Sequence, residues 1–451
     1  MKRYSAQYLQ EWLTEKRRKP LVMRGARQVG KTWLVRNLAQ QSKKQLIEIN
    51  FEENPSLHLA FHSNDPQKII RDLELKLDIK IDIHQSILFL DEIQVFPNLL
   101  SKLRWFYESM PLLPVIAAGS LLDFTLADHT FSMPVGRITY LHVEPLSFEE
   151  FLLAKKSEKL VSFLNECKFN DISEIIHNKL MDLFREYIIV GGIPNSVLTW
   201  IETNSLSKVS RAHSDLLFTY RDDFSKYSGK MPTSHLEAVM IAVPKLLGQK
   251  FVFSHVNRDI KIETLKKTLD LLCKAKLCYK VLSTSANGLP LLSEANEKQF
   301  KVEFIDVGLV STFLKLRLDQ IESINDINLV NQGAISEQVV GQLLRCTEPP
   351  YAEPKNFYWC REEKSSNAEV DYIIQHVNNI IPIEVKSGKT GSMKSLQLFM
   401  QLKKRKFALR INSDLPSLVN VNVKTQDGQP VHYQLLSIPF YLMEQIRRFL
   451  K

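Results

Sequence analysis

The first 150 residues alternate between short apolar runs and segments in which apolar residues recur with helical spacing. An apolar run at 20–23 is followed by a glycine-bounded loop and then by an amphipathic segment from 31 onward. Two further runs, at 87–90 and 114–118, are continuously apolar, which is typical of parallel strands buried on both faces. Strands that alternate with helices in this way predict an α/β fold with a doubly wound parallel sheet.

The pattern changes after residue 150. From 151 to 240 the apolar residues lie three, four and five apart, which predicts helices and is clearest at Ile175, Ile176, Leu180, Leu183 and Phe184. Residues 244–285 are predicted to form a helix, a turn, a second helix and a strand, the order of a winged-helix module. The second helix of such a module either enters a DNA groove or only packs within the protein, and both roles stay open.

Composition narrows the class of protein. The chain has 451 residues, too many for one hydrophobic core, and is 44% hydrophobic and 24% charged. No apolar run reaches the roughly 18 residues of a membrane helix, and the first residues lack the apolar core of a secretory signal. Five scattered cysteines without a CxxC pair argue against a zinc site or a disulfide framework and predict a cytoplasmic protein with no membrane partner. The net charge of +9 favours an anionic partner such as nucleic acid without requiring one.

The loop after the first apolar run matches the phosphate-binding pattern GxxxxGK[ST] in full. Its two glycines permit backbone angles that direct successive N–H groups at phosphate oxygens, next to a helix N-terminus that favours anions. The lysine places a positive charge on the β- and γ-phosphates, and the threonine hydroxyl is a ligand for Mg²⁺. We therefore predict an ATP site with Mg²⁺ that is formed by Gly25, Ala26, Arg27, Gln28, Val29, Gly30, Lys31 and Thr32.

Polar residues end the two later strands. Asp91 follows the second apolar run and is predicted to hold Mg²⁺ through water, and Glu92 is predicted to orient or deprotonate the attacking water. Ser120 ends the third run, which should lie beside the other two strands and bring Ser120 near the γ-phosphate. A carboxylate as general base suits hydrolysis, so the protein is predicted to be an ATPase.

These segments, in this order, resemble a prokaryotic family of AAA+-type ATP-binding proteins. The resemblance rests on GARQVGKT, LFLDEIQ, AAGS, Met133–Arg137, Val143–Phe151, Val190–Pro194 and Phe304–Leu309, and it covers nearly the whole chain. It implies an N-terminal AAA+ ATPase, a C-terminal domain without an assigned function, and a homo-oligomer such as a hexameric ring. Arg137 is then the candidate finger for a neighbouring subunit's nucleotide, with Arg104 as its rival. The alternative is a structural Arg137 paired with Glu144 or another local acid.

The last part of the chain contains a second constellation of charged residues. Glu369–Ile374 and Ile381–Ser387 are predicted to be two strands of a hairpin that turns near His376–Asn379. Asp371 then lies on one strand, and Glu384 and Lys386 share a face of the next. Asp371 and Glu384 are candidate ligands for a second divalent metal, Glu337 on a preceding helix adds a carboxylate, and Lys386 would position or activate the attacking water.

This spacing resembles the PD-(D/E)xK nucleases, in particular the branch with archaeal Holliday-junction resolvases, although Val370 replaces the proline before the aspartate. The resemblance implies a restriction-endonuclease-like α/β domain. The alternatives are surface charges on an ordinary hairpin, or an inactive form of the fold that only binds DNA. A basic run at 401–406 either binds phosphates or is a solvated helix end or strand entry.

We predict four parts: an AAA+ P-loop ATPase core at 1–150, a helical lid or linker at 151–240, a winged-helix-like module at 241–290, and a nuclease-like domain at 291–451. The leading functional hypothesis is an ATPase that acts on DNA, including branched DNA such as Holliday junctions. The alternative is a nucleotide-switched signalling or defence protein whose C-terminal domain is a non-catalytic interaction module.

Overall fold

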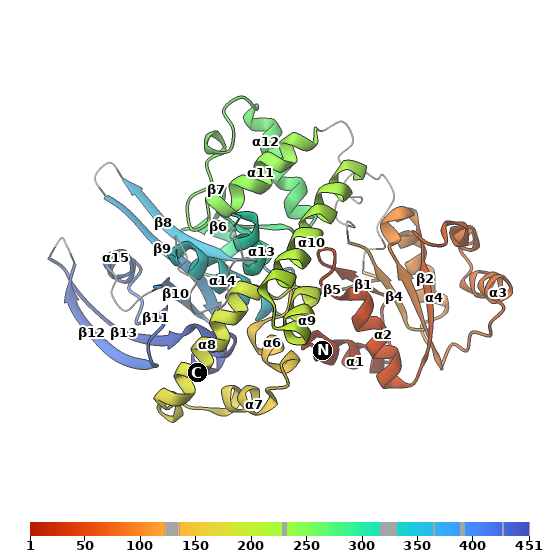
Figure 1. Ribbon diagram of the computed structural model, residues 1–451, viewed down its shortest axis with the longest axis horizontal. Helices are drawn as coiled ribbons and strands as arrows, with labels where there is room; N and C mark the ends of the chain where they lie inside the picture. The colour runs from red at the N-terminus through yellow and green to blue at the C-terminus, as the bar shows by residue number, and fades with distance from the viewer. Residues whose placement is uncertain are drawn as a thin grey trace. The chain divides into compact units, whose positions relative to one another are not determined.

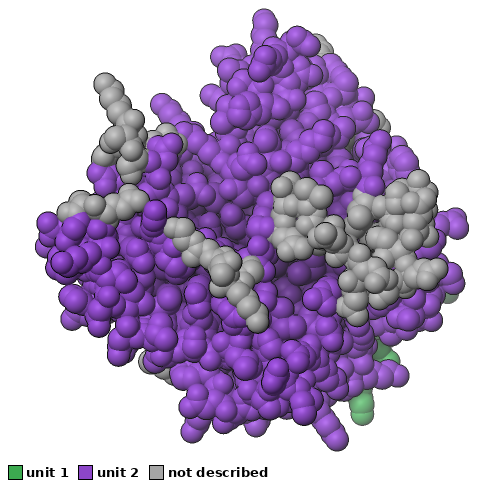
Figure 2. Space-filling model, turned by 60° about the vertical axis from the view of Figure 1, so that its left-hand side comes forward, with its two compact units in different colours: residues 1–145, 274–277, 348–353 green, residues 146–273, 278–347, 354–451 purple. Residues whose placement is uncertain are grey.

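A computed structural model describes residues 1–120, 122, 134, 136–227, 232–315, 332–363, 366–387, 393–425 and 428–450. Met133 and Val135 of the motif noted above lie outside the described residues. The chain divides into two compact units, coloured green and purple in Figure 2. Unit 1 comprises residues 1–145, 274–277 and 348–353, and unit 2 comprises residues 146–273, 278–347 and 354–451.

Unit 1 is built on a five-stranded sheet in which every pairing is parallel (Figure 1). In spatial order its strands are β2 (Gln45–Asn50), β3 (Ser86–Asp91), β4 (Val115–Ala118), β1 (Leu21–Arg24) and β5 (Thr139–His142). Every residue of β3 and β4 is buried, which explains why these runs are continuously apolar. The prediction that the third apolar run lies beside the other two is confirmed, because β4 pairs with both β3 and β1.

Helices follow the strands of unit 1 as the alternating pattern predicts. They are α1 (Ser5–Thr14), α2 (Lys31–Ser42), α3 (Pro66–Leu77) and α4 (Leu103–Ser109), with 3₁₀ segments at Pro55–His62, Ile93–Val95 and Pro97–Lys102. Apolar residues of the strands and of α3 and α4 form one core, which includes Phe51, Phe61, Leu88 and Phe106. The parallel arrangement brings the C-terminal ends of β1, β3 and β4 to the same edge of the sheet.

Unit 2 begins with helices, which confirms the helical pattern predicted between 151 and 240. They are α6 (Phe148–Ala154), α7 (Glu158–Glu166), α8 (Glu174–Val190), α9 (Pro194–Thr203), α10 (Leu206–Tyr227), α11 (Thr233–Lys245) and α12 (Ile262–Lys274). Later helices are α13 (Val307–Phe313), α14 (Gln332–Cys346), α15 (Lys394–Lys403) and α16 (Ile446–Phe449).

The second sheet has eight strands and extends to the β12–β13 hairpin, drawn in blue in Figure 1. In spatial order they are β12 (Ser417–Lys424), β13 (Pro430–Pro439), β11 (Phe407–Asn412), β10 (Asn379–Val385), β9 (Ser366–His376), β8 (Phe357–Glu363), β6 (Cys278–Thr284) and β7 (Ala295–Phe304). His376 lies opposite Asn379, so the predicted hairpin of β9 and β10 is confirmed. β6 pairs with both β7 and β8, and the boundary predicted at 290/291 therefore falls between two paired strands.

A buried aspartate connects two motifs that the sequence singled out. Asp306 accepts hydrogen bonds from the backbone N–H of Gly192 at 2.6 Å and of Gly308 at 3.0 Å, and from Gln342 Nε2 at 3.0 Å. A Cβ on Gly191, which has φ +75°, would lie 1.9 Å from Asp306 Oδ1, so only glycine fits there. The two motifs therefore join the end of α8 to the start of α13 and to α14.

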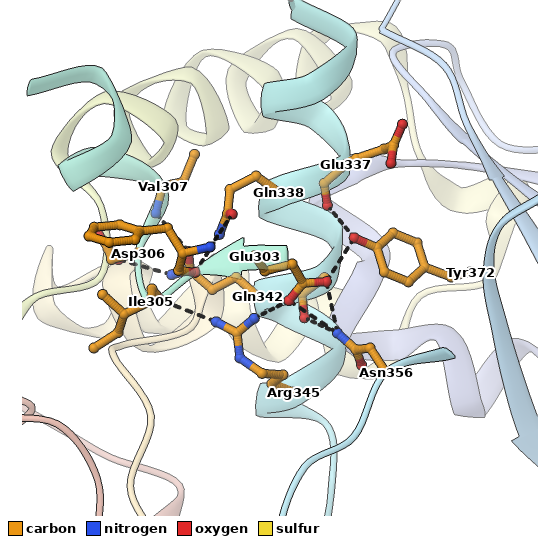
Figure 3. Close-up of polar contacts among 12 residues, drawn as sticks. Glu303, Ile305, Asp306, Val307, Glu337, Gln338, Gln342, Arg345, Asn356 and Tyr372 are labelled. Carbon is orange, nitrogen blue, oxygen red and sulfur yellow. Dashed lines mark hydrogen bonds and ion pairs between the residues drawn. The ribbon is translucent and has the colours of Figure 1, made fainter. Parts of the chain in front are cut away.

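Helix α14 presents a row of buried polar side chains to the same region (Figure 3). Gln338 bonds both the N–H and the carbonyl of Phe304 at 2.8 Å, and Arg345 pairs with the buried Glu303. The Tyr372 hydroxyl lies 2.9 Å from Glu303 Oε1 and 2.8 Å from the carbonyl oxygen of Glu337. Because a buried polar group costs free energy unless it is paired, this network fixes how α14 packs on the sheet.

Candidate functional site

Two glycines with positive φ shape the loop between β1 and α2. Gly25 has φ +149° and Gly30 has φ +97°, and α2 begins directly after Gly30. A Cβ at Gly25 would lie 2.4 Å from the carbonyl oxygen of Val143, so a larger residue would displace the backbone. The loop therefore leads into a helix N-terminus whose N–H groups favour an anion.

Lys31 folds back onto this loop. Its Nζ donates to the carbonyl oxygens of Gly25 at 3.0 Å and Ala26 at 2.8 Å. Burial lowers the pKa of the lysine to about 8, and the nearby Glu92 and Asp91 carboxylates oppose this decrease. The ammonium is therefore held beside the backbone groups that the motif assigns to phosphates.

The predicted magnesium ligands meet at the ends of α2 and β3. Thr32 Oγ1 donates to Asp91 Oδ2 at 2.8 Å, although the two residues are 59 positions apart. Burial raises the pKa of Asp91, and the Thr32 hydrogen bond opposes that rise. A hydroxyl and a carboxylate oxygen at this separation suit Mg²⁺, a hard cation that prefers oxygen ligands and retains water.

Glu92, the predicted base, is held by Gln94, for which no role is predicted. The chain leaves β3 with Glu92 in the left-handed region at φ +52°, and the buried Gln94 donates its Nε2 to Glu92 Oε2 at 2.6 Å. A Cβ on Gly119 would lie 2.4 Å from Gln94 Oε1. Within the described part of the chain, Gln94 Oε1 and Ser120 Oγ are both buried without a hydrogen-bond partner.

The two candidate arginine fingers share one carboxylate. Arg137 Nε lies 2.9 Å and Arg104 Nε lies 3.0 Å from the same oxygen, Glu108 Oε1. The hydrogen bond from Arg137 is the main reason why the pKa of Glu108 is lowered. Both arginines are about half exposed, so they lie on the surface of unit 1.

The C-terminal constellation is also brought together, on β9, β10 and α14. The backbone N–H of Val385 donates to Asp371 Oδ2 at 2.7 Å, and Lys386 Nζ donates to Glu384 Oε1 at 2.6 Å. Lys386 directly follows the last residue of β10, and its side chain reaches the carboxylate of Glu384 as the predicted common face requires. Glu384 is 4% exposed, and its Oε2 has no hydrogen-bond partner in the described residues.

A further lysine, which the sequence analysis missed, lies among these carboxylates. Lys301 on β7 is buried, with its Nζ 2.9 Å from Glu337 Oε2, 2.5 Å from Glu369 Oε1 and 4.0 Å from Asp371 Oδ1. No sequence motif includes Lys301. It lies 36 residues before Glu337, with α13 between them, and other charged residues lie on the same strand. Its position follows only from the sheet.

Charge and burial oppose each other in this carboxylate cluster, which we define as Glu337, Glu369, Asp371 and Glu384. Burial raises the pKa of Glu337 to about 8 and that of Glu384 to about 7. Burial alone would lower the pKa of Lys301, but the surrounding carboxylates raise it well above its usual value. Among the described residues, no three His, Cys, Asp or Glu side chains are arranged to hold a metal ion.

Comparisons with known proteins identify one part of the chain. Residues 17–152 match the family model described as an AAA domain. Residues 181–320 and 332–439 match two families described only as domains of unknown function, DUF8612 and DUF4143. No curated protein matches the chain.

Two solved structures from Aeropyrum pernix are similar to the chain at low scores. The ORC1 protein in complex with DNA is 12% identical, with 68% of this chain and 90% of that chain covered and a TM-score of 0.28. The ORC2 protein in ADPNP–ADP complexes is 11% identical, with 70% and 93% covered and a TM-score of 0.35. Values this low carry no argument about this chain's ligands.

The AAA domain contains every residue predicted for nucleotide binding, from Gly25–Thr32 to Asp91, Glu92 and Ser120. Gln94 lies against Glu92 of that set, and Lys301 lies against Glu337 of the C-terminal one. The only advance signal for Gln94 is its place in LFLDEIQ, where a buried amide follows two carboxylates. Over the described residues, no helix combines the length and apolar character needed to cross a membrane.

Proposed function

We propose that the protein binds and hydrolyses ATP in its AAA domain. The observation that carries this proposal is the hydrogen bond between Thr32 and Asp91, with Glu92 as the next residue. Thr32 and Asp91 would hold Mg²⁺, which neutralises phosphate charge when it is bound. The loop N–H groups and Lys31 bind the phosphates, Glu92 orients or deprotonates the attacking water, and Ser120 Oγ lies near the γ-phosphate.

Two substitutions separate binding from hydrolysis. Lys31→Ala should lose ATP binding, because its ammonium neutralises phosphate charge in the bound state. Glu92→Gln should bind ATP with unchanged affinity but cease to hydrolyse it, because the carboxylate acts on water only at the chemical step. Fluorescent-nucleotide titration and phosphate release measure the two effects. Turnover of Glu92→Gln at the parental rate would show that the base lies elsewhere.

We also propose that unit 2 engages DNA, including branched DNA, through a nuclease-like arrangement of α14, β9 and β10. Support comes from the charge of +9 and from Asp371 on β9, Glu384 on the adjacent strand β10 and Lys386 directly after β10. Within the basic run, Lys403 and Arg405 bond to Asn287 and Ala286 and therefore hold the local structure. Lys404 and Lys406 are exposed and can contact phosphates.

Salt dependence tests this second proposal. Affinity for branched and linear DNA is measured over a range of salt concentrations, with the double variant Lys404→Ala/Lys406→Ala beside the parent. If both lysines contact phosphates, the double variant should reduce the slope of log K against log salt by about 0.9 for each lost contact. The matched control is Lys298→Ala, an exposed lysine on β7. An unchanged slope would exclude Lys404 and Lys406 as contacts.

A second candidate function is a nucleotide-switched signalling or defence protein in which unit 2 is an interaction module. One observation favours it: carboxylates of the predicted nuclease site are already engaged by Lys301, Lys386 and the N–H of Val385. Absence of DNA binding at low salt, with ATP hydrolysis intact, would select this function over the DNA-acting one.

A further inference from the structure

The carboxylate cluster contains its own cations. Four carboxylates and two ammonium groups lie together on β7, β9, β10 and α14. Buried carboxylates repel one another unless a positive charge lies between them, and in nucleases of the predicted kind that charge comes from a divalent metal. Here Lys301 lies between Glu337, Glu369 and Asp371, and Lys386 lies on Glu384.

Lys301 is held in this position from several sides. Its backbone pairs with Val281 of β6, and its residue exposure is 3%. Its Nζ also lies 5.2 Å from the centre of the Tyr358 ring, so the ammonium contacts an aromatic face as well as carboxylates. Because its backbone is paired in the sheet and its ammonium is bonded to carboxylates, the Lys301 side chain has few other conformations.

A divalent cation that bridged Glu337 and Asp371 would come very close to this ammonium. Lys301 Nζ lies 2.9 Å from Glu337 Oε2 and 4.0 Å from Asp371 Oδ1. Mg²⁺ and Mn²⁺ lie about 2.1 Å from their oxygen ligands, so a metal bound to the same two carboxylates would lie next to the ammonium. Like charges so close in a buried site repel strongly. The residues present therefore do not fit a second metal while Lys301 keeps its place.

We propose that Lys301 is the resident cation of the cluster and takes the place of a divalent metal. Unit 2 then keeps the carboxylates of a nuclease-like site in their positions without Mg²⁺ or Mn²⁺, and it does not cut DNA by a metal-dependent route. This inference concerns cation binding alone, and it stands or fails independently of ATP hydrolysis and of DNA binding.

The test measures Mn²⁺ uptake by the full-length, nucleotide-free protein. Asp91→Asn serves as the background, because it removes the carboxylate ligand of the AAA domain. Free Mn²⁺ is followed by electron paramagnetic resonance, and unfolding temperature with and without Mn²⁺ gives a second readout. We expect no stoichiometric uptake in the background, and one Mn²⁺ per chain when Lys301→Met is added. Asp371→Asn should remove that new site, whereas the control Lys298→Met should gain none.

Two outcomes would overturn the proposal. The first is uptake of one Mn²⁺ per chain by the background protein that Asp371→Asn abolishes, because Lys301 would then coexist with a metal. This measurement needs no change at Lys301 and is decisive even if Lys301→Met does not fold. The second is a folded Lys301→Met protein that takes up no Mn²⁺, because a vacated cation position among these carboxylates should be filled.

Discussion

The amide of Gln94 lies between Gly119 and the carboxylate of Glu92 and contacts both residues. A Cβ at position 119, at the end of the third apolar run, would lie 2.4 Å from Gln94 Oε1 and would displace the amide of Gln94. Gln94 in turn holds the carboxylate of Glu92 at 2.6 Å. The small size of Gly119 thus bears on where the candidate base points, because it leaves room for the amide that holds Glu92.

We expect Gly119→Ala to lower the ATPase kcat by about 10- to 100-fold, because a displaced amide leaves Glu92 misoriented. Nucleotide affinity should stay near the parental value, since the loop at 25–32 is unchanged. The double variant Gly119→Ala/Gln94→Ala should be no slower than Gln94→Ala alone, because both changes act through one contact. Gly288→Ala, where an added Cβ meets nothing within 4 Å, is the control. Additive losses in the double variant would contradict this account.

Single residues were predictable where a motif fixes both type and spacing. Lys31, Thr32 and Asp91 lie where the pattern required, and Thr32 and Asp91 are in contact. Gln94 was not predictable as the partner of Glu92, because their contact depends on the left-handed backbone at Glu92, which no local pattern indicates. Lys301 was missed for a different reason: its partners come from three elements distant in the sequence.

Helices α8, α10 and α13 meet at a buried histidine. His213 of α10 donates its Nε2 to the carbonyl oxygen of Val190 at 3.0 Å, and its Nδ1 lies 2.8 Å from Thr312 Oγ1. The ring is fully buried, and burial lowers its pKa from 6.5 to about 4. The folded protein therefore keeps the ring neutral at a pH where the unfolded chain protonates it.

We expect the free energy of unfolding of unit 2 to fall as pH decreases from about 6.5 to about 4. The unfolded state binds a proton in that range and the folded state does not, so the contribution of His213 is fully present above pH 6.5. Its loss amounts to about 3 kcal/mol by pH 4. Denaturant titrations at several pH values measure it. His213→Gln should flatten the pH dependence, whereas the exposed His432→Gln should leave it intact.

Elements were predictable where their own sequence decides them. The apolar runs became β1, β3 and β4, and the β9–β10 hairpin turned where expected. Pairing between distant strands was not predictable, because the periodicity of a segment carries no information about its partner strand. β6, for example, pairs with β8 across more than 70 residues. The strand assigned to a winged-helix-like module is consequently part of the larger sheet.

Oligomeric assembly is the remaining question for the whole molecule. In the single chain, Arg137 and Arg104 both pair with Glu108 on the surface of the AAA domain. This pairing with a local acid is the structural role that was the alternative to a finger for Arg137. The arginine is nevertheless on the surface, where it could reach the nucleotide of a neighbouring subunit. Glu108 would have to release whichever arginine reached another subunit's nucleotide.

We expect Arg137→Ala to lose about 10³-fold or more in turnover without weaker nucleotide binding by the isolated subunit. Mixing it with Lys31→Ala protein should restore part of the activity, because an interface in which the nucleotide site of an Arg137→Ala subunit faces the arginine of a Lys31→Ala subunit has both parts intact. Phosphate release from titrated mixtures measures this recovery. A mixture that stays inactive, with Arg104→Ala giving the recovery instead, would transfer the role to Arg104.

The eight-stranded sheet decides how this protein can be divided and recombined. A fragment that begins at α14 would leave β6 and β7 behind, and the backbone N–H and C=O groups along β8 would then form an open edge prone to pairing with other chains. It would also carry Glu337, Glu369 and Asp371 without Lys301. The region from α14 onward is therefore not a self-contained folding unit. A gene fusion that transferred it intact would have to include residues 278–304.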